Sequence, residues 1–104
     1  MQASKVVLAR DGEPSLAFHG VMIAQAGRRR SGQIRWHVLR VYQTDDEPSR
    51  FVVHTIKYST ESTERILSSV EVLESLDDFG QQFGGKALGK IVCEQLKIDN
   101  VEEV

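Results

Sequence analysis

Cysteine, proline and aromatic residues are scarce in this chain. It has one cysteine, two prolines and 7% aromatic residues in 104 positions. A single cysteine cannot form an internal disulfide, and it offers no cysteine pair for a metal. Cys93 lies in an apolar helical pattern, which predicts a buried and unreactive thiol.

Long apolar segments are also missing. No run approaches the roughly 20 apolar residues that span a bilayer, and the first residues lack the apolar stretch of a signal peptide. We therefore expect a cytoplasmic protein with no membrane partner. The balance of 40% hydrophobic and 27% charged residues is typical of a globular chain, and residues 1–104 are expected to form one domain.

A formal net charge of −2 conceals an uneven distribution. Residues 28–57 carry seven basic and three acidic side chains, whereas residues 58–104 carry four basic and ten acidic ones. Such an asymmetry is suited to steering a charged partner or to attracting a second copy of the chain head to tail.

Segments rich in branched and aromatic residues predict a four-stranded antiparallel meander over about 15–73. A fifth strand at residues 5–10, ended by the Asp11-Gly12 turn, is a further candidate. The four main strands are placed at about 15–26, 33–43, 51–59 and 64–73, the last with a helix as the alternative.

After Ser75 the apolar spacing changes to a helical period, and Ser75 with Asp78 resembles a capping box. One or two helices are expected over about 75–97, packed on one face of the sheet, followed by a flexible acidic tail at 99–104. The predicted fold class is therefore α+β.

Alternation along the strands sorts the side chains onto two faces. If even-numbered residues pair with even-numbered residues, one face is apolar except at Arg40 and His54, and we expect the helices to cover it. Its apolar members are Leu16, Phe18, Met22, Ala24, Ile34, Trp36, Val38, Tyr42, Val52, Ile56, Tyr58, Ile66, Val70 and Val72. The odd-numbered face mixes polar and branched apolar residues, which predicts a cover from residues 5–10 or from a second copy.

The three histidines fall one per strand, but their parity separates them. His54 shares the even-numbered face, whereas His19 and His37 lie on the other. In the assumed register His19 pairs near Val41, and the separation from His37 is about 13 Å at roughly 3.4 Å per residue. Zinc ligands lie about 2 Å from their ion, so we expect no metal and no cofactor.

Arg40 and His54 are placed opposite each other on the apolar face, with Gly20 in the same row. A half-buried arginine needs acceptors. The candidates at the start of the first helix are Glu74, Asp77 and Asp78. A structural bridge between sheet and helix is one interpretation, and a site for a small anionic ligand at Arg40, His54 and Tyr58 is the other.

Three consecutive arginines occupy the predicted connection between the first two main strands. Basic side chains interleaved with aromatic ones can follow phosphates and stack on bases. The residues of this nucleic-acid hypothesis are Arg28, Arg29, Arg30, Arg35, His37 and Lys57. Against it, Trp36 and Tyr42 have core parity and the pI is about 5.9; a solvated loop is the alternative.

The sequence has no nucleophile elbow, P-loop or dinucleotide fingerprint, so we expect no enzymatic activity. The leading hypothesis is a non-enzymatic interaction or assembly module, self-associating as a homodimer through the sheet or binding a protein partner. Binding of single-stranded nucleic acid is the second hypothesis, and the anionic-ligand site is the third.

Overall fold

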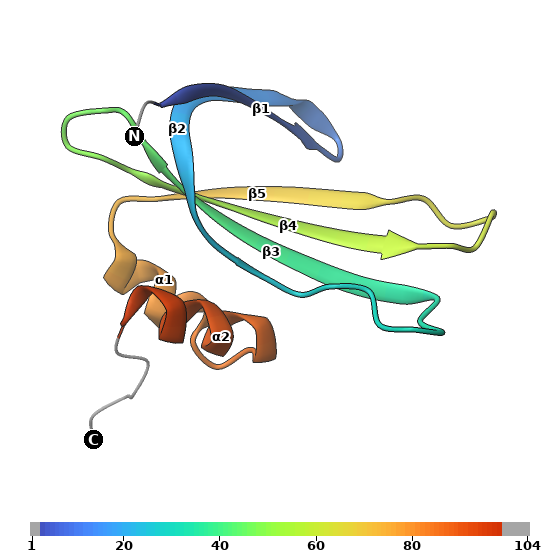
Figure 1. The fold of residues 1–104 in the computed structure, drawn as a ribbon. Coiled ribbons are helices and arrows are strands. Elements are labelled where there is room, and N and C mark those ends of the chain that lie inside the picture. Colours follow the sequence, from blue (N-terminus) through green and yellow to red (C-terminus); the bar gives the residue numbers. More distant parts are fainter. Residues whose placement is uncertain (1–2, 99–104) are drawn as a thin grey trace.

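The computed structural model describes residues 3–98, in which five antiparallel strands precede two helices (Figure 1). These elements are β1 (Ser4–Arg10), β2 (Glu13–Ala26), β3 (Arg35–Thr44), β4 (Phe51–Ser59), β5 (Leu67–Leu73), α1 (Leu76–Phe83) and α2 (Ala87–Leu96). Strand order follows chain order, which confirms the predicted meander and α+β class. Residues 5–10 do form a strand, and so does most of 64–73. The predicted tail at 99–104 lies outside the described residues.

The β1–β2 hairpin arches over one face of the sheet while both helices lie on the other (Figure 1). β2 makes this possible because its first half pairs with β1 and its second half with β3. A bulge between Met22 and Ala24 interrupts the second pairing. Bulges bend and twist a strand, so β2 can leave the plane of the sheet and carry β1 back over it.

The helices cover the odd-numbered face, so the predicted cover of the even-numbered face is wrong. Their core joins residues of the sheet to residues of both helices, namely Ala24, Ala26, Leu39, Val41, Val53, Leu73, Phe79, Val92 and Cys93. The β2 bulge shifts the parity, which moves Ala24 and Ala26 to the helix side. Their small side chains let α2 approach the sheet closely.

The even-numbered face is covered by the β1–β2 hairpin. Leu8 and Phe18 pack onto Tyr42 and Val52 there, and the Phe18 and Tyr42 rings meet edge to face with centroids 5.6 Å apart. Residues 5–10 were expected as a cover for the other face. Both faces of the sheet are apolar in this region, and each is covered from within the chain: the odd-numbered face by the helices and the even-numbered face by the β1–β2 hairpin.

The tip of the β1–β2 hairpin is fastened to the first residues of β5. The Asp11 amide donates to the Ser68 carbonyl oxygen at 3.0 Å, and the Ser68 amide donates to Asp11 Oδ2 at 2.6 Å. The Ser68 hydroxyl donates to the carbonyl oxygen of Ala9 at 2.7 Å. We call these three bonds the clasp; they hold the sheet in a curled form.

The β2–β3 register differs from the assumed one. Gly20 pairs with Thr44 rather than sharing the row of Arg40. A side chain at Gly20 would overlap the backbone carbonyl of Gln43, so this glycine permits close strand contact and leaves no room for Arg40. The shift also places His19 farther from His37 than predicted.

The helices begin and pack largely as their sequence indicates. Ser75 caps α1 by accepting a hydrogen bond from the Asp78 amide at 3.2 Å. The Phe79 and Phe83 rings stack with centroids 5.0 Å apart. Cys93 is buried in the helix-side core, and burial raises the pKa of its thiol, as expected for an unreactive cysteine.

Candidate functional site

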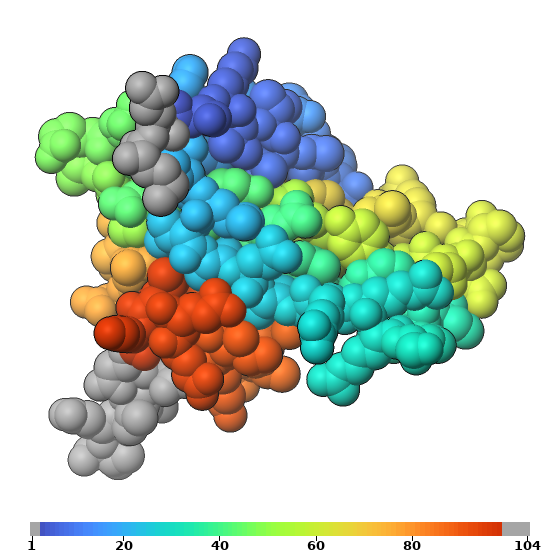
Figure 2. All heavy atoms as spheres, viewed as in Figure 1, coloured from blue at the N-terminus to red at the C-terminus, as the bar shows by residue number. Residues whose placement is uncertain are grey.

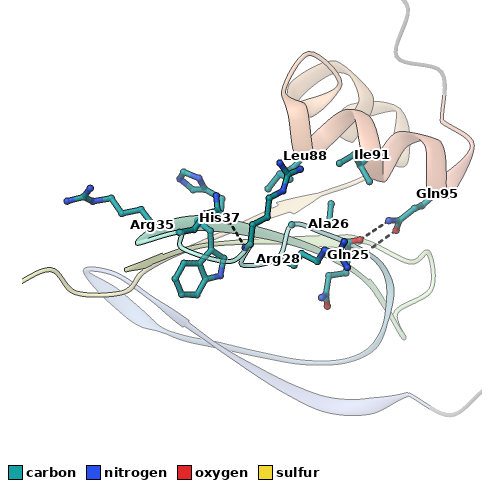
Figure 3. Close-up of a pocket in the computed structure, with 12 residues that line it drawn as sticks. Gln25, Ala26, Arg28, Arg35, His37, Leu88, Ile91 and Gln95 are labelled. Carbon is teal, nitrogen blue, oxygen red and sulfur yellow. Dashed lines mark hydrogen bonds between the residues drawn. The ribbon is translucent and has the colours of Figure 1, made fainter. Parts of the chain in front are cut away.

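The helix layer ends partway along the sheet and leaves a hollow beyond it. The largest depression has a volume of about 610 Å³ and lies between the β2–β3 connection and α2 (Figure 3). A second, of about 520 Å³, continues over β4 and β5, and two of about 390 Å³ each lie against the α1–α2 connection. His37 and Thr55 each line three of the four. We call the four together the basic groove.

The β2–β3 connection is a loop whose backbone is set by two glycines and by hydrogen bonds to Gln33. Gly27 and Gly32 have φ of +92° and +82°, values that favour glycine. The Arg30 amide donates to Oε1 of Gln33, the residue after Gly32, at 2.6 Å, and Arg29 Nε donates to the Gln33 carbonyl oxygen at 3.1 Å. The loop therefore has a defined shape around Gln33.

This loop points two of its three arginines into the groove. Arg28 and Arg30 line the largest depression together with Arg35 and His37. Arg29 instead lies over the Trp36 ring, with its guanidinium carbon 5.2 Å from the ring centroid. The three arginines of the predicted cluster therefore do not act together: Arg28 and Arg30 line the groove, and Arg29 covers Trp36.

Cations outnumber carboxylates around the groove. The largest depression is lined by three arginines and by no carboxylate from the described residues. Lys57 lines the second depression and Lys86 the two smaller ones. The acidic side chains that line the remaining depressions are Asp11, Glu13 and Glu71.

Two of the basic residues at the groove are already paired. Arg35 Nε lies 2.9 Å from Glu64 Oε1, which raises the pKa of Arg35. The hydrogen bond from Ser59, together with that from Arg35, lowers the pKa of Glu64. Arg10 Nη1 lies 3.9 Å from Glu13 Oε2. Arg28, Arg30, Lys57 and Lys86 form no ion pair among residues 3–98.

α2 supplies the apolar wall of the largest depression. Leu88 and Ile91 face it, and Gln95 fixes the helix to β2 (Figure 3). The Gln25 amide donates to Gln95 Oε1 at 3.2 Å, and Gln95 Nε2 donates to the Gln25 carbonyl oxygen at 2.7 Å. The groove thus has a fixed helical side and a cationic loop side.

Of the predicted nucleic-acid residues, Arg28, Arg30, Arg35 and His37 meet in one depression, and Lys57 lies in the adjoining one. Sequence reasoning missed Lys86, whose position depends on how the helices pack. It also assigned Trp36 to the interior, and this was wrong. Trp36 is half-buried, lies outside both core clusters and lines the groove.

The Arg40 and His54 pair has the predicted register, since the two residues are directly opposite on β3 and β4. Arg40 Nε donates to Gln25 Oε1 at 3.3 Å. The predicted bridge to Glu74, Asp77 or Asp78 is not formed among the described residues, because α1 lies on the opposite face. Tyr58 is four residues from His54 along β4, or about 13 Å, so the three predicted ligand-binding residues do not converge.

His54 is buried and bonded to the clasp. Its Nε2 lies 2.6 Å from the Ser68 hydroxyl oxygen. The single proton of that hydroxyl is already donated to Ala9, so Nε2 carries the ring proton and donates. Nδ1 is buried without a partner among the described residues. Burial, and then the Arg40 cation, lowers the pKa of His54 below its ordinary 6.5.

The described residues contain no group of three or more histidine, cysteine, aspartate or glutamate side chains placed to hold a metal. None of their helices is long and apolar enough to cross a membrane. Comparison with protein families, with curated proteins and with solved structures finds no match.

Proposed function

We propose that this protein is a non-enzymatic binding module that holds an extended polyanionic ligand in the basic groove. The observation that carries the proposal is the composition of the largest depression, whose lining has no described carboxylate and holds two arginines, Arg28 and Arg30, that form no ion pair among residues 3–98. The third arginine, Arg35, is paired with Glu64. Uncompensated cations in a concave site attract and concentrate anions. The modest net charge of the whole chain does not oppose this, because the acidic residues are concentrated in the C-terminal half of the sequence.

The Ser68–His54 pair bears on one catalytic alternative, a serine nucleophile with a histidine base. A serine nucleophile must donate its proton to a histidine base. Here the Ser68 proton is donated to Ala9 and the histidine nitrogen donates in turn. The hydrogen bonds therefore run in the direction opposite to that required of a Ser68 nucleophile, and His54 is only 6% exposed.

The homodimer hypothesis loses one of its two motivations. The apolar residues of the odd-numbered face are covered by the helices within the chain, whereas the uneven charge distribution of the sequence is unchanged. Self-association through the sheet stays a prediction, which light scattering after size exclusion tests directly.

The proposed function is tested by fluorescence anisotropy with a labelled single-stranded oligonucleotide and with inorganic polyphosphate, titrated against salt. Both ligands should bind at low salt, and affinity should fall steeply as salt rises. The double variant Arg28→Ala/Arg30→Ala should bind about tenfold or more weakly and show a shallower salt dependence.

The matched control removes two cations outside the groove, in the double variant Lys5→Ala/Arg50→Ala. Lys5 lies on β1, and Arg50 is paired with Asp46 at 2.6 Å in the β3–β4 connection. Its affinity should stay close to that of the wild-type protein. The proposal fails if neither polyanion binds at low salt, or if the two double variants lose affinity equally.

A further inference from the structure

Trp36 lies at the centre of a stack on the uncovered part of the even-numbered face. The Trp36 and Tyr58 rings are 5.2 Å apart with an interplanar angle of 15°. The Arg29 guanidinium lies 5.2 Å from the Trp36 centroid. Neither ring belongs to a core cluster, and both are half-buried. A ligand can therefore stack on the face of Trp36 that lies under Arg29 once that side chain moves away.

The stack is reached from the basic groove. Pairing between β2 and β3 ends at Ala26 and Leu39, and the loop that follows diverges from the start of β3. As a result the largest depression extends past the edge of β3, and Trp36 lines it together with Arg28 and Arg30. A chain that contacts both arginines can also place a planar group on Trp36.

On the basis of the proposed function, we infer that the polyanion is single-stranded nucleic acid, with one base stacked on Trp36 in the position now occupied by Arg29. A strand of unpaired bases combines phosphates for the arginines with planar faces for the aromatic rings. A duplex keeps its base faces stacked internally, and an acidic peptide or polyphosphate offers charge without such faces.

Arg29 is suited to give up its position. Its side chain is exposed and held by one hydrogen bond to the loop backbone. A cation over an exposed aromatic ring is bound more weakly than a stacked base. When a base takes its place, the guanidinium can turn to a neighbouring phosphate and keep a charged partner.

The experiment compares two ligands that differ only in their bases: a single-stranded oligonucleotide and an abasic strand of the same length and phosphate number. Trp36 is the only tryptophan, so its fluorescence reports contact at the stack. The oligonucleotide should bind about tenfold tighter than the abasic strand and change the emission of Trp36. The abasic strand should bind without changing that emission.

The variant Trp36→Leu should bring the oligonucleotide to the affinity of the abasic strand, with the abasic affinity unchanged. If this variant does not fold, the Trp36 emission of the wild-type protein tests the inference: it should change with the oligonucleotide and not with the abasic strand. Equal affinity for both strands with unchanged emission overturns the stacking inference and leaves the polyanion groove in place. Equal or tighter binding of a duplex overturns the single-strand assignment. Failure of both strands and of polyphosphate to bind overturns the proposed function itself.

Discussion

The same three strands, β3, β4 and β5, pass through two unlike halves of the sheet. In the covered half, Val41 and Val53 lie under the helices while Tyr42 and Val52 lie under the β1–β2 hairpin. The open half lacks both covers. It contains Arg35 and Trp36 at the start of β3 and their partners Ser59 and Tyr58 at the end of β4. The connections that bound the open half project from one end of the molecule (Figure 2). Residues that stabilise the fold are thus separated from residues that neither layer covers.

Truncation of a core ring should give the largest difference between the halves. Phe79 is fully buried between α1 and the sheet, and Phe79→Ala should lower the free energy of unfolding by about 3–5 kcal/mol. The comparison is Ile66→Ala, in the β4–β5 connection that bounds the open half; this residue is 53% exposed, and the substitution should cost about 1 kcal/mol or less. Urea denaturation measures both, and similar losses would contradict the division.

Gly89 tests how tightly the covered half is packed. Helix propensity alone predicts that Gly89→Ala stabilises α2 by about 1 kcal/mol. A Cβ at this position would overlap the carbonyl oxygen of Phe83, so we expect a loss of about 1–3 kcal/mol instead. Gly85→Ala is the control, since a Cβ there meets no atom within 4 Å. In thermal unfolding, the melting temperature of Gly89→Ala should fall, whereas that of Gly85→Ala should rise or stay unchanged.

His54 should give the covered half a pH dependence. Because its pKa is lowered in the folded state from the ordinary 6.5, the unfolded chain takes up the proton more readily. Stability from the neutral ring is complete above pH 6.5 and declines as the pH falls toward the lowered pKa. Urea denaturation between about pH 5 and about pH 8 should show this slope in the wild-type protein and in His37→Gln. His54→Gln should lack it, and an unchanged slope there would refute the assignment.

The smallest effect concerns Cys93, and it is measured as the reactivity of its thiol rather than as a change in stability. The thiol is 1% exposed and its pKa is raised by burial, so a thiol reagent should not react with the native protein. In denaturant the reaction should be complete. The variant Ile91→Cys adds a thiol on the exposed side of α2, at a residue that is 44% exposed, and should react at once without denaturant.

The order of the elements could be predicted because it depends on local pattern. Branched and aromatic residues mark the strands, Ser75 marks the start of α1, and the pairing of Arg40 with His54 follows from a short connection. The choice of face could not be predicted, because the chain has two apolar faces and two possible covers. The β2 bulge between Met22 and Ala24 could not be predicted either, because no glycine or proline marks it; it changes parity within the strand and moves Ala24 and Ala26 to the helix side.

The candidate site was predicted in part for a similar reason. Arg28 and Arg30 stand out as charges in a loop, and alternation places His37 and Lys57 on one face of the sheet. Trp36 was misplaced because parity describes which face a residue occupies but not where the cover on that face ends. The cover ends where β1 ends, and this depends on the clasp between distant parts of the chain.

The clasp also has a consequence for the order of folding. Asp11 and Ser68 are 57 residues apart, whereas each strand of the meander pairs with its neighbour across a short connection. Closing the longer loop costs more chain entropy, so the clasp is expected to form after the central strands have paired and to open before they separate. In such an opening the hairpin would lift from Tyr42 and Val52 while β3 and β4 stay joined. The amide protons of Asp11 and Ser68 should then exchange with solvent sooner than those of the β3–β4 ladder.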